Sequence, residues 1–294
     1  MIRKQLRLRA IETVALLLAL VLAPAAFAQR AERASKPEPQ LSVATADILD
    51  SEDGYPVNAE SLFYPGEKIF LLFKVAGYTR GQYDRVNVSW RIDSFGPQGE
   101  RFVTAEKGGV DLELAPQDEK WMPIIRHSPM IPPHAGAGVY KVILTVTDEL
   151  AEKEVTKEVA IHVGGARVEG SDSLTVRGLT FHRTKDGEKL PVAVYRPGDT
   201  VWVNFYITGY HLADDNSFDV ASEVRMVSED GDVVLSFEPE REQDATFYPR
   251  RWLPANLRLD LDPAVPPGKY TLLVLLHDRL AEKTHQSSYT FTVR

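Results

Sequence analysis

The stretch GVYKVILTVTDELAEK, residues 138–153, returns in altered form as GKYTLLVLLHDRLAEK, residues 268–283. Both copies open with a glycine, place a tyrosine two residues later, and close with Leu-Ala-Glu-Lys, at a constant offset of 130 residues. Self-similarity at a fixed spacing indicates one structural unit duplicated in tandem. The sequence therefore predicts two copies of one fold.

Three further landmarks recur at offsets of 131 or 132 residues. They are Tyr64-Pro65-Gly66-Glu67 with Arg196-Pro197-Gly198-Asp199, Gly77-Tyr78 with Gly209-Tyr210, and Trp121-Met122-Pro123 with Trp252-Leu253-Pro254. The nearly constant offset predicts a first repeat over residues 41–164 and a second repeat over residues 171–294. A short glycine-containing hinge separates the two.

Apolar residues alternate along the predicted strands with a period of two, and no window shows a sustained helical period. The alternating residues expected to face the cores are Ile69, Leu71, Phe73, Val75, Tyr140, Val142, Leu144 and Val146, with Val201, Val203, Phe205, Ile207, Tyr270, Leu272, Val274 and Leu276. Turn signals such as Asp53-Gly54 and Asp186-Gly187 separate these runs. The pattern predicts an all-β protein of two antiparallel β-sandwiches.

Two local patterns resemble immunoglobulin-like families. The Gly-x-Tyr sequences at 138–140 and 268–270 resemble the start of strand F, where a tyrosine corner bonds back to upstream backbone. Residues 194–201, VYRPGDTV, resemble the Tyr-x-Pro-Gly-Asp-x-Val signature of macroglobulin-type domains. The resemblance implies tandem immunoglobulin-like sandwiches in an exported protein. Protease trapping is not implied, because the chain has no cysteine for a thioester and only two units.

The N-terminus has the features of a secretory signal peptide over residues 1–28. Basic residues precede an apolar run, and Ala26-Phe27-Ala28 offers small residues for cleavage before Gln29. The alternative is an uncleaved anchor. Residues 29–40, QRAERASKPEPQ, are charged and contain proline, which predicts a disordered linker. We therefore expect an exported protein, periplasmic or extracellular, with no membrane span in the mature chain.

Composition narrows the possible partners. The net charge is −8, and removing residues 1–28, with four basic residues and one acidic one, makes it −11. Such acidity disfavours nucleic acid and anionic membranes, since phosphate binding relies on Lys and Arg. With no cysteine there is no disulfide framework, so each sandwich is stabilised by burial alone.

The sequence shows no recognisable catalytic, cofactor or metal site. No His-Glu-x-x-His or Gly-x-Ser-x-Gly occurs, and the best histidine pair is His277 with His285 near the final hairpin. The acidic cluster Asp214, Asp215, Asn216 and Asp219 has the oxygen-rich composition of a calcium loop. A solvated acidic loop is the favoured interpretation. An enzyme with an unrecognised site is the least favoured function.

Large apolar residues alternate with the core-facing ones where an exposed strand face should be polar. These outward positions are Phe70, Leu72, Trp202 and Tyr206, with Leu273 and Leu275 on a later strand. Either neighbouring parts cover them, or they form a partner surface. Trp121 and Trp252 are expected to be structural plugs. The predicted function is therefore non-catalytic binding or scaffolding of another envelope or extracellular protein, with carbohydrate binding by the outward aromatics as the alternative.

Overall fold

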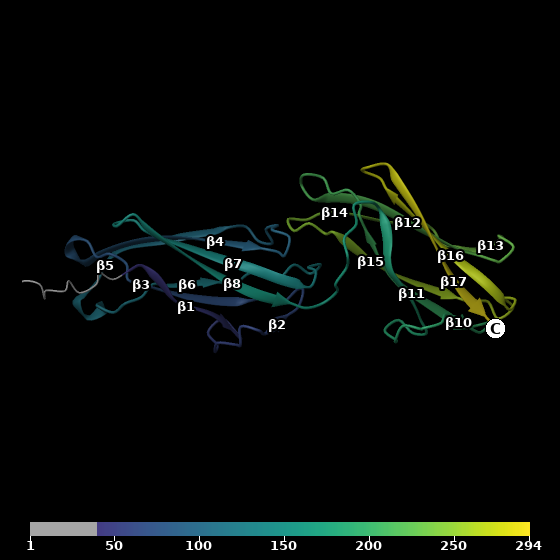
Figure 1. Ribbon diagram of the computed structural model, residues 1–294, viewed down its shortest axis with the longest axis horizontal. Helices are drawn as coiled ribbons and strands as arrows, with labels where there is room; N and C mark the ends of the chain where they lie inside the picture. Colours follow the sequence, from purple (N-terminus) through teal and green to yellow (C-terminus); the bar gives the residue numbers. More distant parts are fainter. Residues whose placement is uncertain (1–39) are drawn as a thin grey trace, which may run out of the picture. The chain divides into compact units, whose positions relative to one another are not determined.

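A computed structural model describes residues 40–294 (Figure 1). The predicted signal peptide and residues 29–39 of the predicted linker lie outside the described residues. Apart from the short 3-10 turns Gln82–Asp84 and Pro116–Asp118, the regular elements of this part are strands. None of its helical segments has the length and hydrophobicity that a membrane crossing requires.

The first repeat consists of two sheets packed face to face (Figure 1). The smaller has the order β1-β3-β6, formed by Ser42–Leu49, Phe70–Ala76 and Ile124–His127. The larger has the order β2-β8-β7-β4-β5, formed by Leu62–Phe63, Lys153–Val163, Gly138–Asp148, Arg85–Phe95 and Glu106–Glu113. All neighbours are antiparallel except β2 and β8.

The second repeat reproduces this topology. Its smaller sheet has the order β9-β11-β15, formed by Thr175–His182, Thr200–Thr208 and Trp252–Asp260. Its larger sheet has the order β10-β17-β16-β12-β13, formed by Val194–Tyr195, Lys283–Val293, Gly268–Asp278, Ser217–Val227 and Val233–Ser236, and β14 (Glu240–Ala245) also pairs with β12. The predicted all-β, immunoglobulin-like sandwich fold is confirmed; the exact domain limits stay a prediction.

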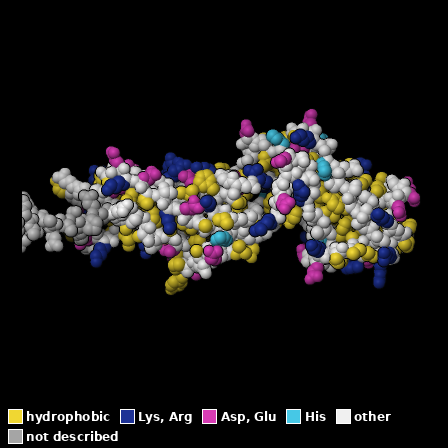
Figure 2. All heavy atoms as spheres, in the orientation of Figure 1, with side chains coloured by type: hydrophobic (Ala, Val, Ile, Leu, Met, Phe, Trp, Pro, Cys, Tyr) yellow, Lys and Arg dark blue, Asp and Glu magenta, His cyan; other side chains and the backbone are white. Residues whose placement is uncertain are grey.

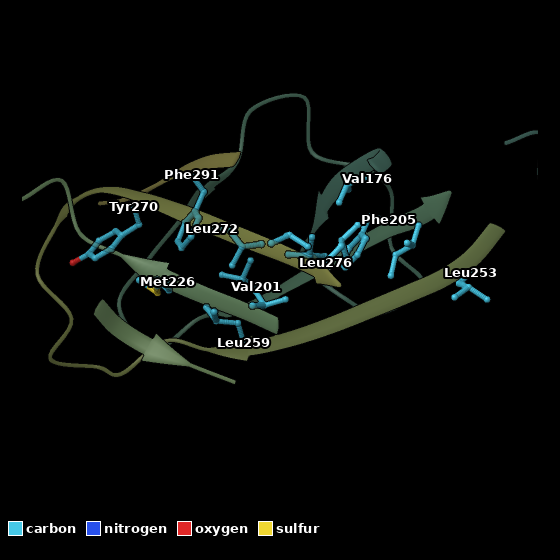
Figure 3. Close-up of a cluster of buried hydrophobic side chains, with 14 of the residues drawn as sticks. Val176, Val201, Phe205, Met226, Leu253, Leu259, Tyr270, Leu272, Leu276 and Phe291 are labelled. Carbon is cyan, nitrogen blue, oxygen red and sulfur yellow. The ribbon is translucent and has the colours of Figure 1, made fainter. Parts of the chain in front are cut away.

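Each repeat buries its own core between its sheets. All sixteen alternating residues predicted to face inward are buried, and they belong to two separate clusters. Figure 3 shows Val201 and Phe205 of β11 directed toward Leu272 and Leu276 of β16. The period-two pattern identified the core because successive side chains on a strand point to opposite faces.

Both tyrosine corners form as the resemblance implied. The hydroxyl of Tyr140 donates to the carbonyl of Gly136 at 3.1 Å, and that of Tyr270 donates to the carbonyl of Pro266 at 2.8 Å. Each acceptor lies four residues upstream of its tyrosine. A buried phenol thus fastens the connection that enters the central strand β7 or β16.

The two Pro-Gly sequences form matching tight turns. The amide of Glu67 donates to the carbonyl of Tyr64, and that of Asp199 to the carbonyl of Arg196, both at 3.0 Å. Gly66 and Gly198 have φ of 88° and 82°, which favours glycine at the third position of a type II turn. The wider macroglobulin-type resemblance stays a prediction.

A buried aspartate ends each central strand. Asp148 accepts backbone hydrogen bonds from Thr79 at 2.6 Å, Leu150 at 3.1 Å and Ala151 at 3.2 Å. Asp278 accepts the equivalent bonds in the second repeat. One carboxylate therefore organises the final hairpin and ties it to the loop that follows the second strand of the smaller sheet, which explains why this aspartate recurs.

Tyr248 of the second repeat packs against the first core. Its hydroxyl donates to Glu100 Oε1 at 3.0 Å and lies 3.1 Å from the hydroxyl of Tyr140. Burial raises the pKa of Tyr248 well above its ordinary value. A loop of the second repeat is thus joined to the tyrosine corner of the first.

Charges of both signs are mixed on the face that Figure 2 shows. Figure 2 shows basic and acidic side chains interspersed over the visible face, with hydrophobic groups between them. Several of these charges are paired across neighbouring strands, as Arg85 is with Asp111 at 2.6 Å. Exposed pairs of this kind contribute little to stability, so the cores carry most of it.

Replacing Asp148 with Ala should lower the free energy of unfolding by at least about 3 kcal/mol, because three backbone N–H groups lose a buried acceptor. Urea unfolding followed by circular dichroism measures the change. Asp260→Ala is the control, since that exposed carboxylate serves only Thr200 and Arg258, and it should cost about 0.5 kcal/mol. Equal losses would contradict the role of Asp148.

Tyr195 makes stability sensitive to alkaline pH. Its hydroxyl is buried and donates to the carbonyl of His182 at 2.9 Å. Burial raises the pKa of Tyr195 to about 12, while Arg183 lowers it and Asp199 raises it by smaller amounts. The folded protein therefore holds this proton at a pH where the unfolded chain has already lost it.

Stability contributed by Tyr195 should be complete below pH 10 and decline by about 1.4 kcal/mol per unit as pH rises from 10 to 12. The Tyr195→Phe variant should show a correspondingly shallower decline in urea unfolding between these values. Tyr55→Phe, at an exposed position, should keep the slope of the parent. A parent slope in the Tyr195→Phe variant would refute the assignment.

Candidate binding face

The four predicted surface residues lie on the central strands of the two smaller sheets. Phe70 and Leu72 belong to β3, and Trp202 and Tyr206 belong to β11. All four are partly exposed, and each alternates with fully buried neighbours. They therefore occupy the outer faces of their sheets, in two separate pairs rather than one patch. Whether a partner uses them stays a prediction.

The outer face around β11 is the richer of the two. Strand register places Trp202 between His182 and Arg258, and Tyr206 between Arg177 and Pro254. Between the two rings, Asn204 lies opposite Thr180 and Asn256. We name this surface the aromatic face; it comprises Arg177, Thr180, Trp202, Asn204, Tyr206, Pro254, Asn256 and Arg258, and the neighbouring His182 is buried.

Neighbouring side chains hold both rings in place. The guanidinium of Arg258 lies 5.8 Å from the centre of the Trp202 ring and its Nε bonds Asp260 at 3.1 Å. The ring of Tyr206 meets that of Trp252 edge to face, with centres 5.3 Å apart. Trp252, expected to be a structural plug, thus also supports this surface. Such constraint lowers the entropy that a ligand contact must overcome.

Polar groups occupy the centre of the aromatic face. Among the described residues, the buried oxygen Oδ1 of Asn204 accepts no hydrogen bond. The hydroxyl of Thr180 lies 3.4 Å from the carbonyl of Asn204 and 2.9 Å from His182 Nε2. Amide and hydroxyl groups therefore lie between two aromatic rings on one rigid sheet.

The equivalent face of the first repeat has different chemistry. Leu72 lies between Asp47 and Arg126, and the Lys68 ammonium lies 5.2 Å from the centre of the Phe70 ring. At the 132-residue offset that holds along this strand, Phe70 stands at the position of Trp202, and Leu72 and Lys74 stand at those of Asn204 and Tyr206. The duplicated frame has thus diverged on its outer surface, which makes the first repeat a natural control for the second.

The first repeat contains a hydrogen-bonded serine, histidine and glutamate that the sequence did not predict; the serine and histidine are buried and the glutamate is exposed. Ser94 Oγ is 3.0 Å from His127 Nε2, and His127 Nδ1 is 2.8 Å from Glu106 Oε2. The order matches the nucleophile, base and orienting acid of serine hydrolases. No short motif could reveal it, because the residues come from β4, β6 and β5.

Burial argues that this trio is structural. Ser94 is 1% exposed and His127 is 6% exposed. Ser94 belongs to the larger sheet and His127 to the smaller one, so their bond links the two layers. A nucleophile must reach its substrate, and this hydroxyl faces the core. The trio satisfies buried polar groups between the sheets.

The other residues considered for metal binding are separated or already paired. His285 is registered with Leu276 and His277 with Thr284, so adjacent positions send the two histidines to opposite faces. Asp219 belongs to β12 rather than to the acidic loop. Over residues 40–294, no group of three or more potential ligands is placed to hold a metal ion.

Asp219 is engaged by arginine. Arg241 donates to both of its carboxylate oxygens, at 2.8 and 2.6 Å, and Arg279 lies 3.6 Å away. The bond from Arg241 holds the pKa of Asp219 below its ordinary value. A carboxylate paired in this way is a poor calcium ligand, so the solvated acidic loop stays the favoured interpretation.

Comparison with known proteins yields distant structural likenesses. No model of a protein family matches the chain, and no curated protein matches it. The C-terminal domain of the Streptococcus agalactiae AgI/II polypeptide BspA aligns with 85% of this chain and 99% of its own, at 10% identity and a TM-score of 0.29. The C-terminal domain of the Streptococcus pyogenes antigen I/II-family protein AspA aligns with 87% and 99%, at 10% identity and 0.33. At these scores, the fold assignment rests on the strand order alone.

The Ser94→Ala variant should be destabilised by about 2 kcal/mol, because His127 loses a buried partner. The parent should not react with a fluorophosphonate probe at neutral pH. Ser128→Ala, at the exposed position beside His127, should change stability by less than about 0.5 kcal/mol. Labelling of the parent that Ser94→Ala abolishes would show instead that the trio is catalytic.

Proposed function

We propose that this protein is an exported, non-catalytic binding protein whose recognition surface is the aromatic face of the second repeat. One observation carries the proposal: Trp202 and Tyr206 share the outer face of one strand, remain partly exposed, and are each held by a neighbouring side chain. The expected partner is another protein of the envelope or the extracellular space.

The chemistry of this face is that of an interaction surface. Tryptophan, tyrosine and arginine are the residues most enriched among those that contribute most to binding energy in protein interfaces. The central strand of a sheet positions them more firmly than a loop would. An aromatic pair flanked by Arg177 and Arg258 therefore supports recognition better than Phe70 and Leu72 of the first repeat do.

The absence of a catalytic role is supported by how the reactive groups are used. The Ser94–His127 bond joins two sheets. Asp148 and Asp278 bind backbone amides, and Asp219 binds arginine. These groups contribute to folding, because each is already engaged by other groups of the protein. The side chains suited to binding a partner are those of the aromatic face.

Export is supported by sequence. Residues 1–28 have the basic, apolar and small-residue regions of a signal peptide. A chain without cysteine needs no oxidation to mature, so it suits either the periplasm or the exterior. The resemblance to macroglobulin-type domains, which rests on residues 194–201, is part of the same proposal.

Carbohydrate binding is the second candidate, because polar groups lie between the rings. Trp202 and Tyr206 are four residues apart, or about 13 Å along a strand. The amides of Asn204 and Asn256 lie in that interval; Oδ1 of Asn204 is buried, but Asn256 is exposed and could bond sugar hydroxyls. Arg258 lies over the Trp202 ring, however, and must shift before a sugar can stack there. Because of this requirement, we favour a protein over a carbohydrate as the partner.

The partner protein would be recovered by cross-linking in an envelope extract of the source cell. A double variant, Trp202→Glu with Tyr206→Glu, should recover at least ten-fold less of it than the parent does. Both substitutions place charge on the aromatic face without entering the core. Quantitative mass spectrometry of the captured proteins measures the loss, and a thermal melt confirms that the variant is folded.

The matched control is Phe70→Glu with Leu72→Glu, which adds the same charges to the equivalent strand of the first repeat. This variant should recover the partner as the parent does. Elution of the captured material by oligosaccharides alone would favour the second candidate. Equal recovery by all three proteins would refute the aromatic face as the recognition surface.

A further inference from the structure

The larger sheet of each repeat ends in strands whose outer edge is unpaired within the described chain. β5 closes one side of the first repeat, and β13 and β14 share the corresponding side of the second. An edge strand exposes backbone N–H and C=O groups to which another strand can pair. Proteins usually protect such edges with charge.

Two of these edges carry that protection and the third does not. The sequence of β5 is EKGGVDLE and that of β14 is EREQDA, both rich in charge. The sequence of β13 is VVLS. Val233, Val234 and Leu235 are 57%, 46% and 37% exposed. An apolar edge is therefore open to solvent.

The first repeat shows what the same position looks like when it is covered. Gly96 and Ser228 begin equivalent turns, closed by bonds to Glu100 at 2.7 Å and Asp232 at 2.9 Å. Two residues after the acid, the first repeat has Phe102, which is 4% exposed and packs edge to face on Tyr140.

At the equivalent position of the second repeat stands the exposed Val234. Tyr248, from the second repeat, contacts Glu100 and Tyr140 of the first repeat, near Phe102. Within residues 40–294, no segment plays that role for Val234, and the corner residue Tyr270 bonds only its own backbone acceptor. The chain thus contains both a covered and an uncovered form of the same feature.

Charge defines what could cover β13. Residues 228–240, SEDGDVVLSFEPE, contain five acidic residues and no basic one. Arg225, which is registered with Ser236, is paired with Glu223. A second copy of β13 in antiparallel pairing would oppose acid to acid, which disfavours self-association. A segment with basic ends would be complementary.

We propose that β13 is a docking edge that accepts an extended segment of a partner protein by strand addition. The segment carries apolar residues that pack beside Val233, Val234 and Leu235, and lysine or arginine at its ends. Backbone hydrogen bonds supply much of the affinity in this mode of recognition. The acidic flanks set register and favour basic partners. This surface is distinct from the aromatic face.

The probe is a capped nonapeptide of sequence Lys-Lys-Val-Thr-Val-Thr-Val-Lys-Lys, titrated into the mature chain and followed by calorimetry and amide hydrogen exchange. Binding should protect residues 233–236 from exchange and should weaken as salt rises. Val234→Lys should weaken binding at least ten-fold. Val192→Lys, at another exposed valine, should bind within two-fold of the parent.

A peptide with glutamates in place of the lysines should bind at least ten-fold more weakly than the basic one. Four outcomes would overturn the proposal: no binding of the basic peptide, protection elsewhere than β13, equal affinity for the acidic peptide, or a dimer in sedimentation that Val234→Lys abolishes. The last would show that a second copy of the chain occupies the edge.

Discussion

Inward burial along the central strands β7 and β16 is the constraint on which each repeat depends. Each of these strands pairs on both sides within its larger sheet and sends Tyr140 or Tyr270 into the core. With no cysteine in the chain, no covalent link supplements this burial. The tyrosine corner at the start of each strand and the buried aspartate at its end therefore anchor the connections that keep the two sheets opposed.

Comparison of the two repeats distinguishes the residues that the fold requires from the positions that can vary. The Pro-Gly turns, corners and aspartates recur because each makes the same backbone hydrogen bonds in both repeats. The outer faces and edges have diverged: Lys74 and Tyr206 differ although they hold equivalent positions on the central strand of a smaller sheet. Recognition is therefore expected to reside in these divergent surfaces.

Much of the fold could be predicted because its signals are local. Alternation identified the residues of both cores, and the recurring Gly-x-Tyr predicted the corners. The bond between Ser94 and His127 could not be predicted, since it depends on how two sheets face one another. The suggestion that His277 and His285 approach each other was wrong, because a one-residue difference in register sends them to opposite faces.

The sequence by itself determined that this chain is a tandem pair of β-sandwiches, and it identified the residues that face inward, since strand periodicity and turn residues act over a few positions. It also marked Trp202 and Tyr206 as outward-facing aromatics. Only the tertiary structure decided which polar residues lie beside Asn204 between the two rings. It also decided that Tyr248 covers the tyrosine corner of the first repeat and that the edge at Val234 is exposed. Those features depend on strand register and on contacts between segments distant in the chain, which local patterns do not encode.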